Sequence, residues 1–443
     1  MKSLLIENIL ILCGGTLHGA APGGEISAVT SDSRAVTPGC LFAAVRGGHD
    51  YIGAALDAGA ACALAERVPE GVKGCVIVVP DTVAALQRLA GFYRAQFPVP
   101  LVGVTGSVGK TTAKEMTAAV LGRALRVHKT AGNYNNDLGV PLTLLGLRED
   151  HGAAVVELGV SHPGDMERIA AIARPTVALY TNIGDAHLEF LGDRAGVLAE
   201  KSVMNRYLPR DGVVLLNGDD PLLRTMDCPQ RKLRYGLGPD CEVRAEEIQS
   251  LPDASTECVV AAEGRRFRVR IPAFGEHLVY AALGAVAAGL VLGLADEDIA
   301  SGIGDYVPVG SRGRLLHSPS LTVIDDCYNA NPSSTAAALR SLAKIPGRRV
   351  AILGDMLELG GRSGELHRAT GALARELGLD LLLCAGPESE QTAAGAGDIA
   401  RCFPDRAALI AALPNLLRPG DTVLVKASRS MRFEEITAAL EAL

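Results

Sequence analysis

The chain has 443 residues, which at about 150 residues per domain suggests about three domains. Hydrophobic residues make up 48% and charged residues 21% of the sequence, as in a globular protein with substantial cores. The formal net charge of −7 excludes the basic balance of a general nucleic-acid-binding protein, so we expect no nucleic-acid partner. No apolar run approaches the roughly 20 residues that span a bilayer, so we expect no integral membrane association.

The first residues could suggest export, because Lys2 precedes an apolar stretch. Glu7 and Asn8 interrupt that stretch and no small-residue cleavage site follows, which favours a helix over a signal peptide. The ten cysteines are scattered without a CxxC pair, as is typical of ordinary thiols in a reducing cytoplasm. We therefore expect a cytoplasmic protein, and we expect it to be a monomer.

The pattern of elements predicts an α/β protein with three domains. Residues 1–98 are predicted to form a small mixed α/β domain, with strands at 41–45 and 75–79 and helices at 51–60 and 82–95. The prolines of FPVP, at 97–100, are typical of a linker.

Residues 99–308 are predicted to form a central domain with a phosphate loop and a parallel sheet. Its predicted strands are 101–105, 153–158, 177–183 and 213–217; helices are expected at 110–124 and, as a buried apolar helix, at 278–294.

Residues 309–443 repeat the strand–helix alternation and are predicted to be Rossmann-like. The predicted strands are 321–325, 349–353, 381–384 and 422–425, and the predicted helices are 335–343, 364–377, 406–413 and 433–443. No GxGxxG fingerprint is present, so dinucleotide binding is not supported.

The strongest local signal is VGVTGSVGKTT at 102–112, between a predicted strand and a predicted helix. Gly106 and Gly109 allow the backbone to curl so that amide hydrogens point at phosphate oxygens. Lys110 can neutralise phosphate charge and Thr111 can bind magnesium, although Val104 stands where the strict motif has its first glycine. The predicted ATP-binding residues here are Gly106, Ser107, Val108, Gly109, Lys110, Thr111 and Thr112.

Further polar residues follow the next predicted strands. Glu157 ends an apolar strand, where a carboxylate can meet a metal beside the phosphates. Asn182 and His187 follow the strand after it, in TNIGDAHLE, and Lys201 lies on a predicted helix. Taken alone, His187 could be a buried structural histidine and Lys201 a surface lysine. The guanine-reading NKxD element is absent, which disfavours a switch GTPase.

Taken together, these motifs resemble the Mur ligases, ATP-dependent enzymes that form amide bonds in peptidoglycan precursor synthesis. The matching segments, in order, are TSDSR at 30–34, TGSVGKTT, GNYNNDLGVP at 132–141, ELG at 157–159, TNIGDAHLE, GR at 313–314, DDCYNANPSS at 325–334, GDMLELG at 354–360 and VKASR at 425–429. Each segment alone is weak evidence for the family, but their order along the whole chain is specific to it.

Within that family, GNxNN and GDMxELG favour the branch that adds D-alanyl-D-alanine to a UDP-N-acetylmuramoyl-tripeptide. The DNPR motif of the diamino-acid-adding ligase is absent, so that ligase and a folylpolyglutamate synthase-like ligase are the alternatives. Two further alternatives are a non-ligating ATP-binding protein and a degenerate ligase kept as a scaffold. The motifs leave open which residue is third in the tripeptide.

The resemblance implies the remaining site residues. The nucleotide site would also include Asn182, Arg314, Asp325, Tyr328 and Asn329. The substrate-binding residues would be Ser33, Arg34 and His49 for the uridine end, Asn133, Asn135 and Asn136 for the muramoyl peptide, and Asn331, Asp355, Glu358, Ser428 and Arg429 from the last domain. Leu278 and Ala281 replace two asparagines that help seat adenosine in the family, so adenosine must be held differently here.

The implied reaction phosphorylates a carboxylate with ATP and then lets an amine displace the phosphate. The catalytic residues would be Lys110, Glu157, His187 and Lys201, and the ligands of two magnesium ions would be Thr111, Glu157, His187 and Lys201. Lys201 aligns with a position that is often carbamylated in the family, although Val203 replaces the usual glutamate two positions later. An ordinary cationic lysine is the alternative.

Overall fold

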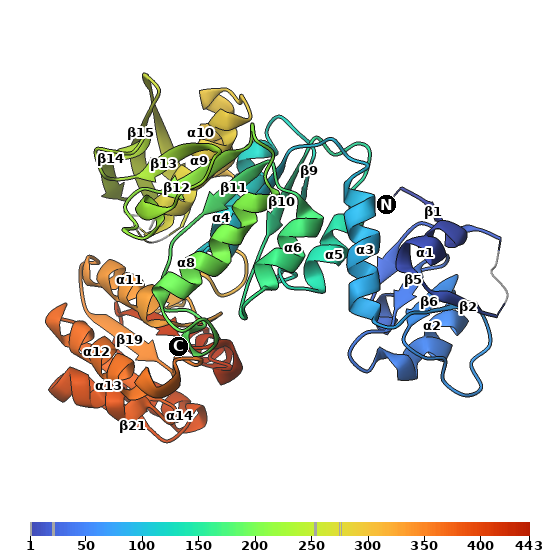
Figure 1. Cartoon of the computed structure of the whole chain (residues 1–443). Helices are drawn as coiled ribbons and strands as arrows, with labels where there is room; N and C mark the ends of the chain where they lie inside the picture. The colour runs from blue at the N-terminus through green and yellow to red at the C-terminus, as the bar shows by residue number, and fades with distance from the viewer. Residues whose placement is uncertain (1, 20–22, 252–254, 274, 276) are drawn as a thin grey trace.

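The computed structural model describes residues 2–19, 23–251, 255–273, 275 and 277–443. It has three α/β domains, and the N-terminal and C-terminal domains lie on different sides of the central one (Figure 1). The predicted fold class is therefore confirmed. Among the described residues, no helix combines the length and the apolar character needed to cross a membrane.

The N-terminal domain is built on a sheet in the order β2-β7-β6-β5-β4, parallel except for β2 at one edge. Its strands are β2 (Thr16–His18), β4 (Val29–Thr30), β5 (Leu41–Ala43), β6 (Cys62–Ala65) and β7 (Val76–Val78), and β1 (Leu4–Leu5) pairs with β3 (Glu25–Ile26) beside it. The helix predicted near the N-terminus is α1 (Ile6–Cys13), and the helix predicted at 51–60 is the shorter α2 (Ile52–Asp57).

Helix α3 (Thr82–Arg94) joins this domain to the central one. It begins where the Asp81 carboxylate accepts a hydrogen bond from Ala84 N at 2.9 Å. Its buried face packs on α5 (Gly139–Leu145) and α6 (Asp165–Ala173), as Figure 1 shows. Tyr93 Oη donates to Leu147 O at 2.7 Å and Arg94 Nε donates to Ala173 O at 3.1 Å. The two domains therefore share one hydrophobic core.

The central sheet has the order β16-β15-β14-β13-β12-β11-β8-β10-β9 and is parallel from β9 to β14. These seven strands are β8 (Leu101–Thr105), β9 (Val127–Lys129), β10 (Ala153–Glu157), β11 (Val177–Tyr180), β12 (Val213–Asn217), β13 (Arg231–Gly236) and β14 (Val243–Ser250). The strands β8, β10 and β11 are buried along their whole length, as expected of parallel strands covered by helices.

An antiparallel edge that the sequence analysis did not predict extends this sheet. It consists of β15 (Thr256–Ala262) and β16 (Arg265–Ile271). The helices of the domain include α4 (Lys110–Leu121), α8 (Arg194–Ser202), α9 (His277–Val291) and α10 (Asp296–Gly304). Residues of α9 pack in the core against α4 and the sheet, which confirms the predicted buried helix.

The C-terminal sheet has the order β17-β18-β22-β19-β20-β21, parallel except for β17. Its strands are β17 (Arg314–His317), β18 (Thr322–Asp325), β19 (Arg349–Leu353), β20 (Leu381–Ala385), β21 (Ala400–Phe403) and β22 (Thr422–Lys426). Its helices are α11 (Pro332–Ala343), α12 (Ser363–Glu376), α13 (Ser389–Ala396), α14 (Arg406–Leu416) and α15 (Glu434–Glu441). Two hydrophobic clusters, one on each face of the sheet, form the core.

Helices α12 and α13 approach so closely that a glycine on each is required. A Cβ at Gly371 would lie 1.8 Å from Thr392 O, so we expect Gly371→Ala to destabilise the C-terminal domain by about 1–3 kcal/mol through overpacking. Urea unfolding monitored by circular dichroism measures this difference. Gly361→Ala is the matched control, because a Cβ there meets nothing within 4 Å. Equal stability of the two variants would contradict the prediction.

Candidate active site

The phosphate loop, residues 106–109, connects β8 to the N-terminus of α4. Gly106 has a φ of +148°, and a Cβ there would lie 1.9 Å from Thr181 Oγ1, so any other residue would strain the backbone and displace the Thr181 side chain. Gly109 has a φ of +81° and precedes the first turn of α4. The first amides of that helix lack helical partners, and the residues that carry them line a cavity, which is the arrangement that binds phosphate.

A segment after β11, residues 181–184, holds the phosphate loop in place; we call it the clamp segment. Asn182 accepts hydrogen bonds from two successive amides of the loop, at 3.0 Å from Ser107 N to its backbone oxygen and at 2.9 Å from Val108 N to its side-chain oxygen. Ser107 Oγ in turn accepts from Gly184 N at 2.8 Å. Asn182, predicted to bind ATP, lines the cavity and also shapes the loop.

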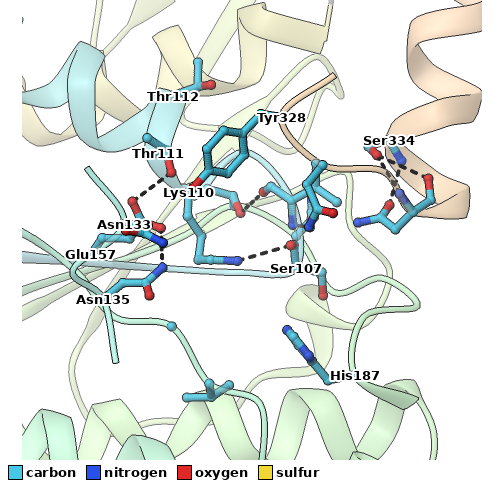
Figure 2. Close-up of a pocket in the computed structure, with 18 of the residues that line it drawn as sticks. Ser107, Lys110, Thr111, Thr112, Asn133, Asn135, Glu157, His187, Tyr328 and Ser334 are labelled. Carbon is cyan, nitrogen blue, oxygen red and sulfur yellow. Dashed lines mark hydrogen bonds between the residues drawn. The ribbon is translucent and has the colours of Figure 1, made fainter. Parts of the chain in front are cut away.

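A cluster of polar side chains lies where β8, β10 and β11 end, because parallel strands bring their carboxyl ends to one edge of the sheet. Glu157, at the end of β10, is 2% exposed. Its Oε2 accepts a hydrogen bond from Thr111 Oγ1 at 2.9 Å, and its Oε1 accepts one from Asn135 Nδ2 at 2.8 Å (Figure 2). The structure thus joins the phosphate-loop helix to a residue predicted to bind the muramoyl peptide.

Lys110 folds over the phosphate loop, donating to Gly106 O at 2.7 Å. It also donates to Ser107 O at 3.2 Å (Figure 2). Burial lowers the pKa of its ammonium group, while Glu157 opposes that shift. The two hydrogen bonds hold the ammonium group next to the loop that would bind a phosphate.

One cavity of about 930 Å³ collects these groups. Its wall includes most of the predicted phosphate-loop residues, the three predicted asparagines and residues of the C-terminal domain. The predicted site residues that line it are Ser107, Val108, Gly109, Lys110, Thr111, Thr112, Asn133, Asn135, Asn136, Glu157, Asn182, His187, Tyr328, Asn329 and Asn331. Leu278 and Ala281, the two substitutions noted in the sequence, also line it.

The C-terminal domain supplies a positively charged wall. The Arg312 guanidinium lies 3.7 Å from the centre of the Tyr328 ring, and that of Arg429 lies 5.2 Å from it. Asn331 caps α11 by accepting from Ser334 N at 2.9 Å, and the first turn of α11 lines the cavity. Lys426 also lines it, where its Nζ donates to Asp326 Oδ2 at 2.6 Å. Arg312, Lys426 and the N-terminus of α11 therefore line the same cavity as the phosphate loop, whereas Arg429 does not line it.

His187 and Glu358 meet across the boundary between the central and C-terminal domains. His187 Nδ1 lies 3.1 Å from Glu358 Oε2, and both residues have left-handed backbones, with φ of +58° and +62°. Burial, with help from the charges of Lys110 and Lys201, lowers the pKa of His187 to about 4. The imidazole is thus neutral near pH 7.

Lys201 is 1% exposed on α8 and is not among the residues that line the cavity. Burial lowers its pKa well below the usual value, and the charge of Lys110 adds to the shift. A buried lysine of this kind carries a neutral amine far more readily than one on the surface.

Several other predicted residues lie outside the cavity wall. Arg314 pairs with buried Asp325 at 3.4 Å across β17 and β18. Ser428 Oγ accepts from Leu357 N at 2.9 Å, and Asp355 Oδ1 accepts from Glu388 N at 3.1 Å, so these two residues brace loops. Ser33, Arg34 and His49 lie in the N-terminal domain, where Arg34 pairs with Asp32 and His49 accepts from Glu66 N.

The sequence analysis missed other residues that line the cavity. They are Arg46, Asp137, Gly159, Val160, Ser161, His162, Asp165, Arg168, Thr181, Asn217, Tyr235, Tyr280, Arg312, Asp326, Ser333, Ser334 and Ala337. Asn217 could have been found, because it ends strand β12 at the same sheet edge as Glu157. Arg46 pairs with Asp137 at 3.1 Å from another domain, and no local pattern signals such a distant contact.

The donor set fits one magnesium ion at Thr111 and Glu157. Magnesium prefers hard oxygen ligands and is commonly held by one or two protein oxygens plus substrate phosphates. A hydroxyl and a carboxylate oxygen 2.9 Å apart beside the phosphate loop match that pattern. The described residues contain no group of three or more His, Cys, Asp or Glu side chains suited to a metal ion.

Comparisons with known proteins agree with this geometry. The family described as Mur ligase middle domain matches residues 104–289, and the Mur ligase, glutamate ligase domain matches residues 311–429. The UDP-N-acetylmuramoyl-tripeptide–D-alanyl-D-alanine ligase of Bacillus subtilis is 36% identical, and the alignment covers 98% of each chain.

Two solved structures are similar over nearly all of the chain. The crystal structure of MurF from Acinetobacter baumannii has a TM-score of 0.92 at 32% identity and covers 100% of this chain and 99% of its own. MurF ligase from Thermotoga maritima, solved in complex with ADP, has a TM-score of 0.83 at 29% identity, with 94% and 97% covered. The chain belongs to the Mur ligase family.

Proposed function

We propose that this protein is an ATP-dependent ligase that joins D-alanyl-D-alanine to a UDP-N-acetylmuramoyl-tripeptide in peptidoglycan precursor synthesis. The tripeptide carboxylate takes the γ-phosphoryl group of ATP, which gives an acyl phosphate and ADP. The amine of D-alanyl-D-alanine then attacks the acyl carbon, and inorganic phosphate leaves. The full-length similarity to ligases with this name supports the substrate pair.

The observation that carries the proposal is the single cavity in which three domains meet. Arg46 comes from the N-terminal domain, Lys110 and Glu157 from the central domain, and Tyr328 from the C-terminal domain. The tripeptide carboxylate and the γ-phosphate of ATP are both negatively charged and repel each other. The first step therefore needs positive charge placed in advance. Lys110, Arg312 and the N-terminus of α11 supply that charge around the space where the γ-phosphoryl group would lie.

Thr111 and Glu157 are the residues that would hold magnesium, which would neutralise phosphate charge during transfer. Asn135, which donates to Glu157, would keep the carboxylate oriented. The other asparagines of that loop, Asn133 and Asn136, are placed to bind the muramoyl peptide next to the nucleotide.

The decisive experiment measures phosphate release and new peptide bonds with a panel of substrates. UDP-muramoyl dipeptide or tripeptide is supplied with single amino acids or with D-alanyl-D-alanine. We expect product only from the tripeptide with D-alanyl-D-alanine. Product from the dipeptide with a diamino acid would establish the alternative ligase, and ATP hydrolysis that ignores all acceptors would contradict ligation.

Replacing the carboxylate at the end of β10 tests its role in the chemical step. We expect Glu157→Gln to lower kcat about 100-fold, because several kcal/mol of charge stabilisation depend on the metal site, while the Kd of the UDP-muramoyl-tripeptide changes less than about threefold. Turnover assays and calorimetric titration of the uridine substrate measure the two quantities. Equal losses in both would contradict a role at the metal.

We further propose that Lys201 reacts through its neutral amine with carbon dioxide to form a carbamate and release a proton. The anionic carbamate would support a second magnesium ion together with His187, whose pKa near 4 leaves it neutral. The alternative is that Lys201 remains an unmodified lysine.

If Lys201 is carbamylated, truncating its side chain removes an anionic group that a small carboxylate can replace. We expect Lys201→Ala to lose activity and to regain part of it with added short carboxylates such as formate or acetate, which can occupy the vacated space. Turnover at increasing carboxylate concentration measures the rescue, and the wild-type protein under the same additions is the control. An inactive variant that no carboxylate restores would contradict the carbamate.

We also propose that the protein acts as a monomer in the cytoplasm. The ten cysteines are all free thiols, as a reducing compartment favours. One chain contributes every domain that lines the cavity, so the site needs no second copy.

A further inference from the structure

Lys114 is a buried cation that the proposed chemistry does not use. It lies one turn after Lys110 on α4, and its side chain is 0% exposed. Its Nζ donates to Thr130 O at 2.8 Å and to Gly132 O at 3.4 Å. The Glu115 carboxylate lies 2.8 Å from the same nitrogen. Burying a charged group is costly unless hydrogen bonds and an opposite charge compensate for the lost water. Here the two carbonyl groups and the Glu115 carboxylate provide that compensation.

The two carbonyl groups belong to residues 130–136, which we call the asparagine loop. This loop carries Asn133, Asn135 and Asn136 into the cavity. Its other end is tied to the site through Asn135, whose Nδ2 donates to Glu157 and whose backbone oxygen accepts from Gly159 N at 2.8 Å. The loop is therefore held between the phosphate-loop helix and the end of β10.

We propose that Lys114 is a positioning residue that fixes the asparagine loop against the helix that binds the nucleotide phosphates. This inference rests on the proposed function, because the loop is taken to hold the muramoyl substrate. A single ammonium group on α4 donates to two carbonyls at the start of the loop, so it fixes this end of the loop against the helix while Asn135 fixes the other end. Accurate placement of the carboxylate against the γ-phosphoryl group depends on that distance.

Lys129 provides a matched comparison. It also pairs with Glu115, from β9, but its side chain is 47% exposed. Among the hydrogen bonds of the described residues, the one from its Nζ goes to Glu115 and none goes to a carbonyl of the asparagine loop. A loss of charge beside Glu115 can thus be separated from a loss of the loop contacts.

Lys114→Met and Lys129→Met form the test pair, and wild-type protein is assayed beside them. We expect Lys114→Met to lower kcat/KM for the muramoyl substrate about 100-fold, since a misplacement of about 1 Å has effects of that size. We expect its Kd for ATP to change less than about threefold, because the backbone of residues 106–111 that binds phosphate is intact. Lys129→Met should resemble wild type in both quantities.

A second readout follows the loop without relying on turnover. The chain contains no tryptophan, so Tyr134→Trp, in the half-exposed middle of the asparagine loop, gives a single fluorophore. In that background we expect Lys114→Met to lower the fluorescence anisotropy and to increase acrylamide quenching. Lys129→Met should change neither.

The outcomes separate the inference from the proposed function. Unchanged kcat/KM or unchanged anisotropy in Lys114→Met overturns the positioning role. So does a loss of ATP affinity as large as the loss of kcat/KM, because that would indicate general damage to α4. If wild-type protein makes no peptide bond, the proposed function fails, while the anisotropy and ATP titrations still decide whether Lys114 fixes the loop.

Discussion

The hydrogen bonds between the phosphate loop and the clamp segment are the constraint on which the rest of the site depends. Asn182 binds the loop at two successive amides, and the bare Cα of Gly106 lets Thr181 lie against it. These contacts fix the direction in which α4 leaves the sheet. Because Lys110, Thr111 and Lys114 are all on α4, that direction also fixes the phosphate, metal and loop contacts.

In the proposed reaction, the same edge of the central sheet would bring ATP and the muramoyl peptide together. Glu157 receives a hydroxyl hydrogen bond from the nucleotide side and an amide hydrogen bond from the asparagine loop. The C-terminal domain completes the cavity with Arg312, Tyr328 and the first turn of α11. A further cross-domain contact is the pair formed by His187 and Glu358, both of which have left-handed backbones.

Features encoded by neighbouring residues could be predicted from the sequence, and features made by distant contacts could not. The strands at 101–105 and 213–217 have the predicted bounds, because short apolar runs between glycines and helices mark them clearly. Strand β11 ends at Tyr180 rather than at 183, since the next residues turn to bond the phosphate loop. The family resemblance pointed to Arg314, which pairs with buried Asp325, whereas the cavity is lined by Arg312, two residues earlier, which stacks on Tyr328 and which no local pattern had signalled.

The shared core around α3 has a consequence for how the molecule loses its structure. One continuous hydrophobic cluster runs from Leu4 to Met226, whereas the C-terminal domain is built on separate clusters between Leu321 and Leu440. Cooperative units follow such clusters. Heating would therefore melt the N-terminal domain together with the central one, and the C-terminal domain would contribute a calorimetric transition of its own.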